Sequence, residues 1–223
     1  RVETRQSDDE DKLGFSSGLV GELREGLAAS ARMMAFFTDT ALMSLLALRV
    51  ALLTLRRGLT EFSSYGFASY ALVLGGAFQR YTRAYEFGLL AKRLNERLQN
   101  RALDSKLEFM FTMFCLPYVE PLDAAWPGMQ RAQALGLANG DLTFRTYAAS
   151  TLTIFGMIAG KPVAEQVAMC QQGLRLAQQE GNVDIAMMNQ QRMRALRCLD
   201  GSNPNPLSLD APESTEQEFW RPF

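Results

Sequence analysis

The sequence predicts an all-α protein: a right-handed superhelical stack of antiparallel helix pairs, or α-solenoid, with a period of about 41 residues. Three blocks that begin at Tyr65, Lys106 and Tyr147 can be superposed without a gap. Each block starts with an apolar stretch, passes through a break and ends in a second stretch with helical spacing. No segment shows the alternation that is typical of a strand. A fixed period of this length indicates helix pairs that bury their apolar faces on one another.

The second stretch of each block carries small residues in step, as close contacts between helices require. Ala91 aligns with Ala132 and Gly173 when the blocks are superposed. The two stretches of a block are separated at equivalent positions by Arg80, Pro121 and Pro162. These breaks predict that each block is one helix pair with a short turn.

Two further helices are expected before the repeats. Residues 1–15 are acidic and predict a flexible lead. A first helix is expected over 17–37, and a two-residue break separates it from a second helix over 40–57. The second helix is apolar almost all round, which predicts burial on every side. Gly58, just beyond it, suits a helix end.

The three blocks predict three helix pairs. Their expected ranges are 62–79 with 82–98, 103–119 with 122–138, and 142–159 with 163–180. Gly140 and Gly181 follow helix ends, where a left-handed conformation is common. Asp141 and Asn182 are suited to cap the helices that follow. Pro127 lies four to five residues inside its expected helix and should kink that helix or delay its start.

A final helix over 183–199 closes the expected stack. Its polar face suits a terminal cap that faces solvent and consists of Asn189, Gln190, Gln191, Arg192 and Arg194. Residues 200–223 are rich in turn-forming and acidic residues and have little to bury, which predicts a linker or tail. The expected organisation is therefore an acidic flexible lead (1–15), one helical-repeat domain (16–199) and a linker or acidic tail (200–223).

The composition is that of an ordinary globular chain. Of 223 residues, 48% are hydrophobic and 21% are charged, and the net charge is −1. Bases are mixed with acids, so no nucleic-acid partner is expected. The three cysteines are far apart and predict reduced core residues. We recognise no signal peptide and no apolar span long enough for a bilayer, so a cytoplasmic location without membrane contact is expected.

Catalysis within these residues is not expected. The chain has no histidine, which excludes Ser-His-Asp and Cys-His catalysis and the common histidine metal sites. It has no P-loop and no glycine-rich dinucleotide motif. Glu108 and Glu120 lie on one expected helix, about 18 Å apart at a rise of about 1.5 Å per residue, too far for an acid–base pair. We therefore expect no enzyme, no cofactor and no metal site in this chain.

A surface for a protein or peptide partner is the expected functional site. In stacks of helix pairs, the first helices of the pairs usually line the inner, concave face. The side chains expected on this face are Tyr65, Ser69, Glu108, Thr112, Tyr147, Ser150 and Thr151. The alternative interpretation is that they are ordinary polar positions exposed to solvent.

Four segments carry a resemblance to a known family. They are LMSLLALRVALLTLRRG at 42–58, SYGFASYALVL at 64–74, AYEFGLLA at 84–91 and GLANGDLTF at 136–144. Together they resemble the tetratricopeptide-like helical-repeat region of large bacterial-type signalling proteins. Those proteins join a Ser/Thr-kinase-like or cyclase module, an AAA/STAND ATPase, helical repeats, and a GAF plus histidine-kinase module. The resemblance covers residues 38–182 and rests on structural rather than catalytic positions.

The resemblance implies a repeat domain that relays or senses signals between an ATPase and an output module. None of the family's kinase, nucleotide-binding or phosphoacceptor motifs can be placed in this sequence. The leading expectation is a non-catalytic scaffold for protein–protein interaction or signal relay, as a segment of a larger signal-transduction protein. Two alternatives stay open. One is a sensor that encloses a small molecule or peptide, and the other is a part of a multidomain signalling kinase or ATPase known by that activity.

Overall fold

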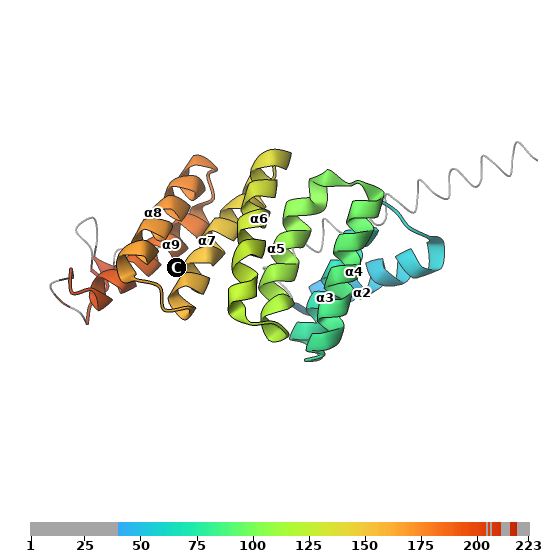
Figure 1. Cartoon of the computed structure of the whole chain (residues 1–223), viewed down its shortest axis with the longest axis horizontal. Helices are drawn as coiled ribbons and strands as arrows, with labels where there is room; N and C mark the ends of the chain where they lie inside the picture. Colours follow the sequence, from blue (N-terminus) through green and yellow to red (C-terminus); the bar gives the residue numbers. More distant parts are fainter. Residues whose placement is uncertain (1–39, 204, 206, 211–214, 218–223) are drawn as a thin grey trace, which may run out of the picture. The chain divides into compact units, whose positions relative to one another are not determined.

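The computed structural model of the chain describes residues 40–203, 205, 207–210 and 215–217. This part contains eight α-helices, three short 3₁₀ turns and no strand (Figure 1), so the all-α prediction is confirmed. The helix expected over 17–37 and the lead expected over 1–15 lie outside the described residues. The chain divides between Leu103 and Asp104 into two compact units, and each is described by itself.

The first unit contains three α-helices and a short turn. They are α2 (Thr40–Arg57), α3 (Ser63–Gly76), α4 (Tyr81–Leu98) and η1 (Arg101–Leu103). Helix α3 packs against both of its neighbours in sequence. It approaches α2 closely at Gly66, where an added Cβ would lie 2.6 Å from Cγ1 of Val50. The missing side chain of Gly66 therefore sets the distance between the two helices.

Aromatic and polar contacts join α3 to α4. The rings of Tyr70 and Phe87 meet edge to face with centroids 4.9 Å apart, an arrangement that the ring quadrupoles favour. The Ser64 hydroxyl donates to Oδ1 of the buried Asn95 over 2.9 Å. Nδ2 of Asn95 donates to the Asn100 carbonyl over 2.8 Å. A buried amide with both ends paired fixes how α4 lies on α3.

The prediction that α2 is buried on every side is wrong. Ala47, Val50 and Thr54 form a buried face, whereas the side chains of Leu45 and Leu55 are 65% and 74% exposed. The reason is that α3 is the main helical neighbour of α2 among the described residues. A helix with one main neighbour buries one face, whatever its composition.

The second unit contains five α-helices and two short turns. They are α5 (Asp104–Phe114), η2 (Leu116–Tyr118), η3 (Leu122–Ala124), α6 (Ala125–Asn139), α7 (Leu142–Ile158), α8 (Val163–Gln179) and α9 (Val183–Leu199). Each helix packs against the next, and their colours run from green for α5 to orange for α8 and α9 in Figure 1. In addition, α5 contacts α7 and α7 contacts α9. The odd-numbered helices of this unit therefore lie side by side.

The ends of these helices confirm the capping predictions. Gly140 and Gly181 adopt φ values of +73° and +67°, the left-handed region that glycine enters without steric cost. Oδ1 of Asp141 accepts a hydrogen bond from the backbone N–H of Phe144, and Asn182 does the same for Ile185. Both side chains thus satisfy an N–H that has no partner inside its helix.

Prolines account for the differences in length. The helix expected over 103–119 is too long, because α5 ends at Phe114 and Pro117 lies in η2. Proline disfavours a helical conformation in the residue before it. The delayed start predicted from Pro127 is confirmed, since η3 comes first and α6 begins at Ala125. Pro127 then occupies the first turn of α6, where its missing N–H costs little.

The core of the second unit is made of small and flexible apolar side chains. Ala132, Ala148 and Met129 have no exposed surface. Cys170 packs with Met193 and Leu196 between α8 and α9. All three cysteines of the chain are free, and Cys115 and Cys170 are buried, as the sequence predicts. Cys198 differs, because it is only partly buried.

Candidate functional site

A polar seam joins α7 to α9 and is the most distinctive constellation in the second unit. It consists of Ser150 and Thr153 on α7 and of Asn189 and Arg192 on α9. Nη1 of Arg192 donates to the Ser150 carbonyl over 2.9 Å, to Oγ of Ser150 over 2.6 Å and to Oγ1 of Thr153 over 2.9 Å. These three bonds hold the guanidinium against α7 and fix its orientation.

The charge of Arg192 is not balanced by a carboxylate among the described residues. Burial lowers the pKa of its guanidinium below the usual value. Two other arginines of the unit do have acidic partners: Arg131 lies 2.9 Å from Glu108, and Arg145 lies 3.4 Å from Glu180. A half-buried cation without an ion pair is costly and is therefore a candidate binding group.

Asn189 stabilises the seam from a fully buried position on α9. Its side chain has no exposed surface, and Nδ2 donates to the Ile185 carbonyl over 2.9 Å and to Oγ of Ser150 over 3.4 Å. Its Oδ1 has no hydrogen-bond partner among the described residues. This oxygen faces Gly173 of α8, where an added Cβ would lie only 2.9 Å away. The glycine makes room for a buried amide that ties three helices together.

Two aromatic side chains of α7, before Ser150 in the sequence, contact an aromatic side chain of α5. Tyr147 lies 5.5 Å from Phe144 and 6.0 Å from Phe109 between ring centroids. Burial, and secondarily the negative charge of Asp184, raises the pKa of the Tyr147 phenol. Asp184 belongs to the first turn of α9, two turns before Arg192 and about 12 Å from it along the helix. The face therefore offers a phenol, a carboxylate and a guanidinium at separate points.

Asp184 also borders a polar cleft of about 410 Å³ at the start of α7 and α9. The residues that line the cleft are Leu142, Thr143, Glu180, Gly181, Asn182, Val183 and Asp184. Glu180 accepts hydrogen bonds from Arg145 and from the Thr146 hydroxyl. Burial raises the pKa of the Glu180 carboxyl, and the positive charge of Arg145 opposes this rise. The cleft is therefore acidic, in contrast to the region around Arg192.

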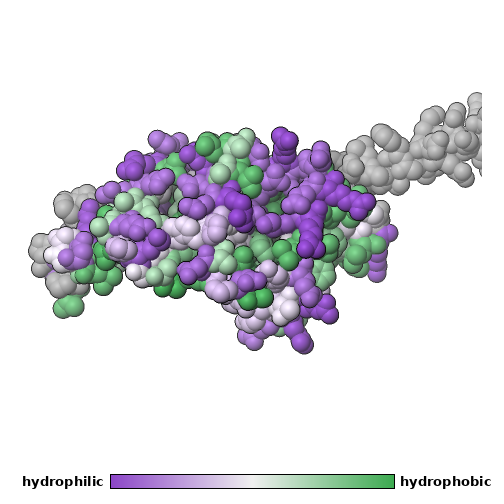
Figure 2. Space-filling view, viewed as in Figure 1, coloured by the Kyte–Doolittle hydropathy of each residue, from purple (hydrophilic) through white to green (hydrophobic). Residues whose placement is uncertain are grey.

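A second, smaller pocket of about 290 Å³ lies at the opposite ends of the helices. Trp126 and Phe155 contribute its aromatic walls, and Lys161 lies at its edge. Nζ of Lys161 is 4.5 Å from the centroid of the Trp126 ring, a cation–π contact. Figure 2 shows hydrophilic and hydrophobic residues interspersed on one face of the molecule. Hydropathy therefore does not single out one patch there, and the contacts between helices locate the seam.

The partner-binding face expected from the sequence is largely not exposed. Six of its seven side chains are buried: Tyr65, Ser69, Glu108, Thr112, Ser150 and Thr151. The reason is that small hydroxyls lie at contacts between helices; Oγ1 of Thr112, for example, faces Gly128. Tyr147 is half-buried. Ser150 belongs to the seam and Tyr147 lies one turn before it on α7, whereas Tyr65 and Ser69 belong to the first unit. The binding role of the seven residues stays a prediction.

Sequence reasoning missed Arg192 as a site residue. It assigned the polar residues of the last helix to a solvent-facing cap, but Asn189 and Arg194 are 0% and 4% exposed. No signal in the sequence distinguishes it. Arg192 has no acidic residue one turn before or after it on α9, and the same is true of the exposed Arg175 on α8.

Among the described residues, no three His, Cys, Asp or Glu side chains come together as a metal site would require. None of the described helices combines the length and apolar content needed to cross a bilayer. The sequence matches no model of a known protein family, and a search of curated proteins finds no match either.

Proposed function

We propose that the chain is a non-catalytic helical-repeat scaffold whose second unit binds a protein or peptide partner along the α7–α9 seam, with Arg192 as the anchor for a partner carboxylate. The observation that carries this proposal is the half-buried guanidinium of Arg192, which has no acidic partner among the described residues. A carboxylate from outside the chain would supply the missing charge.

The geometry of Arg192 suits this role. Its hydrogen bonds to Ser150 and Thr153 all come from Nη1, so the Nε–Nη2 edge is available to a partner. Arginine binds carboxylates through two parallel N–H donors. Because Nη1 is already fixed, little side-chain entropy is lost when a partner binds. The nearby Tyr147 ring offers the kind of rigid aromatic contact that dominates binding interfaces.

The helix arrangement supports a solenoid. Helix α7 begins at Leu142 and α9 at Val183, about 41 residues later, and α5, α7 and α9 lie side by side. In a right-handed stack of helix pairs these would be the first helices of successive pairs, which line the concave binding face. The resemblance of residues 38–182 to the repeat region of signalling proteins supports a role as a relay segment in a larger protein.

Selection of short random peptides on the intact chain tests the proposal. We expect the selected peptides to contain Asp or Glu. Arg192→Met should weaken their binding about tenfold or more, which corresponds to ~1.4 kcal/mol, measured by isothermal titration calorimetry. Arg192→Lys should recover part of the affinity, since it keeps the charge but not the two-donor geometry.

The matched control is Arg175→Met, which removes an exposed arginine from α8. It should leave the affinity unchanged. If the selected peptides lack acidic residues, or bind Arg192→Met as well as the parent chain, the anchor role of Arg192 is wrong.

A small-molecule sensor is the second candidate, and the pocket beside Trp126 is the observation that favours it. Its volume of about 290 Å³ and its aromatic walls suit a small planar ligand. A ligand that binds only the folded chain raises the melting temperature in a concentration-dependent way. A screen of small aromatic acids should give such a shift, and Trp126→Ala should abolish it. A shift that survives this substitution would place the ligand elsewhere.

A further inference from the structure

After α9 the chain turns back on itself. Residues 208 and 209 contact the side of α9 that carries Arg194 and Cys198. The Asn203 amide donates from Nδ2 to the carbonyls of Ser208 over 2.7 Å and Asp210 over 3.3 Å. Nη1 of Arg194 donates to the Leu209 carbonyl over 3.0 Å. The Cys198 thiol lies 3.3 Å from the Ser208 carbonyl. Three consecutive carbonyls are thus each bound by a side chain of α9 or of the turn after it.

The segment forms no helix or strand, and side chains of the tail itself accept hydrogen bonds from two of its N–H groups. The Leu209 N–H donates to Oε2 of Glu216 over 3.2 Å, and the Asp210 N–H donates to Oγ of Ser208 over 3.1 Å. The Glu216 N–H donates to Oδ1 of Asp210 over 2.7 Å. Asp210 also lies in the electrostatic field of Arg194. Arginine side chains are also the groups with which peptide sites recognise acidic segments.

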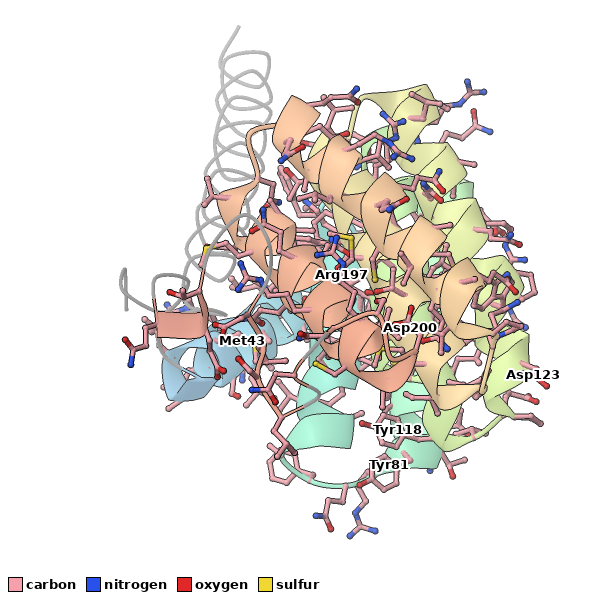
Figure 3. All side chains as sticks on the ribbon, turned by 90° about the vertical axis from the view of Figure 1, so that its left-hand side faces the viewer. Met43, Tyr81, Tyr118, Asp123, Arg197 and Asp200 are labelled. Carbon is pink, nitrogen blue, oxygen red and sulfur yellow. The ribbon has the colours of Figure 1, made fainter. Side chains whose placement is uncertain are left out.

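Burial and charge distinguish this site from an ordinary surface turn. Arg194 is 4% exposed and Asn203 is 9% exposed, so both side chains that bind the carbonyls of residues 208–210 are buried. Figure 3 shows Arg197 and Asp200 at the C-terminal end of α9, where hydrogen bonds from Ser202, and to a smaller extent the charge of Arg197, lower the pKa of Asp200. Arg194 and Arg197 outnumber Asp200 at the end of α9, and the segment that returns to it carries the acid Asp210.

We propose that the outer side of α9, formed by Arg194, Cys198 and Asn203, is a recognition site for an extended acidic peptide, and that the chain's own residues 207–210 occupy it as a tethered ligand. The sequence predicts a tail with little to bury, whereas side chains of α9 and of the turn after it bind this segment as they would a peptide. A free copy of the segment binds only when the tethered copy leaves.

Occupancy by the tail is tested on the intact chain with two isosteric variants. Asn203→Asp removes the N–H donor that binds the Ser208 and Asp210 carbonyls and places a negative charge next to them. Asn205→Asp makes the same change two residues on, where Oδ1 only accepts a hydrogen bond from the Leu207 N–H. We expect Asn203→Asp to speed hydrogen exchange of the Leu209 and Asp210 amides about tenfold. Asn205→Asp should stay within about twofold of the parent chain.

Alkylation of Cys198 gives an independent readout. Cys115 and Cys170 are 1% and 0% exposed, so a maleimide reaches Cys198 first. Because the tail lies against its sulfur, Asn203→Asp should speed this reaction in parallel with the amide exchange. Equal rates in the parent chain and both variants would mean that the tail does not occupy the site, and would overturn the proposal.

Recognition in trans is tested with a fluorescein-labelled peptide of residues 205–217. Asp210→Lys with Glu216→Lys gives the tail a charge that Arg194 repels, and releases it while the site stays intact. This chain should bind the peptide at least about tenfold more tightly than the parent chain by anisotropy. Adding Asn203→Asp to it should abolish binding. Binding that is equal in all chains would be non-specific, and self-association in place of peptide binding would make a second copy the occupant; either result overturns the proposal.

Discussion

Single glycines set the spacing of neighbouring helices in the second unit. Gly173 faces the buried Asn189, and Gly128 faces Thr112, in both cases with no room for a Cβ. Glycine inside a helix lowers helix propensity by about 1 kcal/mol relative to alanine. The close approach of the buried polar side chain must therefore outweigh that loss.

This balance predicts opposite signs for two Gly→Ala substitutions. At Gly173 the added Cβ would lie 2.9 Å from Oδ1 of Asn189, which is fully buried and cannot move away. We expect Gly173→Ala to lower the free energy of unfolding by about 1–2 kcal/mol, measured by urea denaturation. At Gly76, the last residue of α3, nothing lies within 4 Å. Gly76→Ala should leave stability unchanged or raise it by up to about 1 kcal/mol. A destabilised Gly76→Ala, or a stabilised Gly173→Ala, would contradict the packing argument.

At the scale of single residues, the sequence shows which side chains of a helix are polar but not which of them are buried. It placed Ser150 and Thr151 on a helix face that should bind a partner, yet both are buried. It treated Arg192 as part of a solvated face, although the residue is held by Ser150 and Thr153, about 40 positions earlier in the chain. Burial of a polar side chain depends on which helix lies opposite, and helical periodicity in one segment does not contain that information.

Helix boundaries at the scale of single elements follow from local chemistry. The predicted start of the helix over 183–199 matches α9, because Asn182 and Gly181 act within the turn itself. The end of α5 was missed because the apolar pattern continues through Phe114 to Leu116, whereas Pro117 stops the helix. Boundaries set by caps can be predicted from a few residues, whereas those set by competition between an apolar pattern and a proline cannot.

The cap of α7 gives a prediction for a single element. Oδ1 of Asp141 accepts the Phe144 N–H over 3.3 Å, and this N–H has no partner inside the helix. Asp141→Ala should lower the free energy of unfolding by about 1 kcal/mol, measured by urea denaturation. Asp141→Asn keeps an oxygen acceptor and should stay within a few tenths of a kcal/mol of the parent chain. Equal losses in the two variants would mean that charge, rather than the cap hydrogen bond, stabilises this end of α7.

In the molecule as a whole, local order is far better determined by the sequence than long-range partners are. Repeats contact mainly their neighbours, so a periodic pattern predicts the order of packing without knowledge of distant contacts. The exposed leucines of α2 show where this reasoning stops, since an apolar pattern does not tell how many neighbours a helix has. The seam and the returning tail depend on contacts between side chains and distant main-chain atoms, which no period encodes.

The stability of the second unit should depend on pH through Glu180. Burial raises the pKa of this carboxyl above its usual value of 4.5, and Arg145 only partly opposes the rise. The folded chain therefore binds the proton more tightly than the unfolded chain does. Stability should be greatest below the unfolded pKa, fall as the pH rises past it, and level off above the raised folded pKa. This direction is opposite to that of a carboxyl whose pKa is lowered by an ion pair.

Glu180→Gln isolates this contribution because glutamine keeps the shape and does not titrate. The free energy of unfolding of Glu180→Gln minus that of the parent chain should increase from pH 4 to pH 7, measured by urea denaturation at each pH. Arg145→Met removes the opposing charge. When both chains also carry Arg145→Met, the difference in the free energy of unfolding between the chain with Glu180→Gln and the chain without it should therefore increase more steeply with pH. A difference that is constant, or that decreases with pH, would mean that the Arg145 charge outweighs the burial of Glu180. The ionised Glu180 carboxylate would then stabilise the folded chain instead of destabilising it.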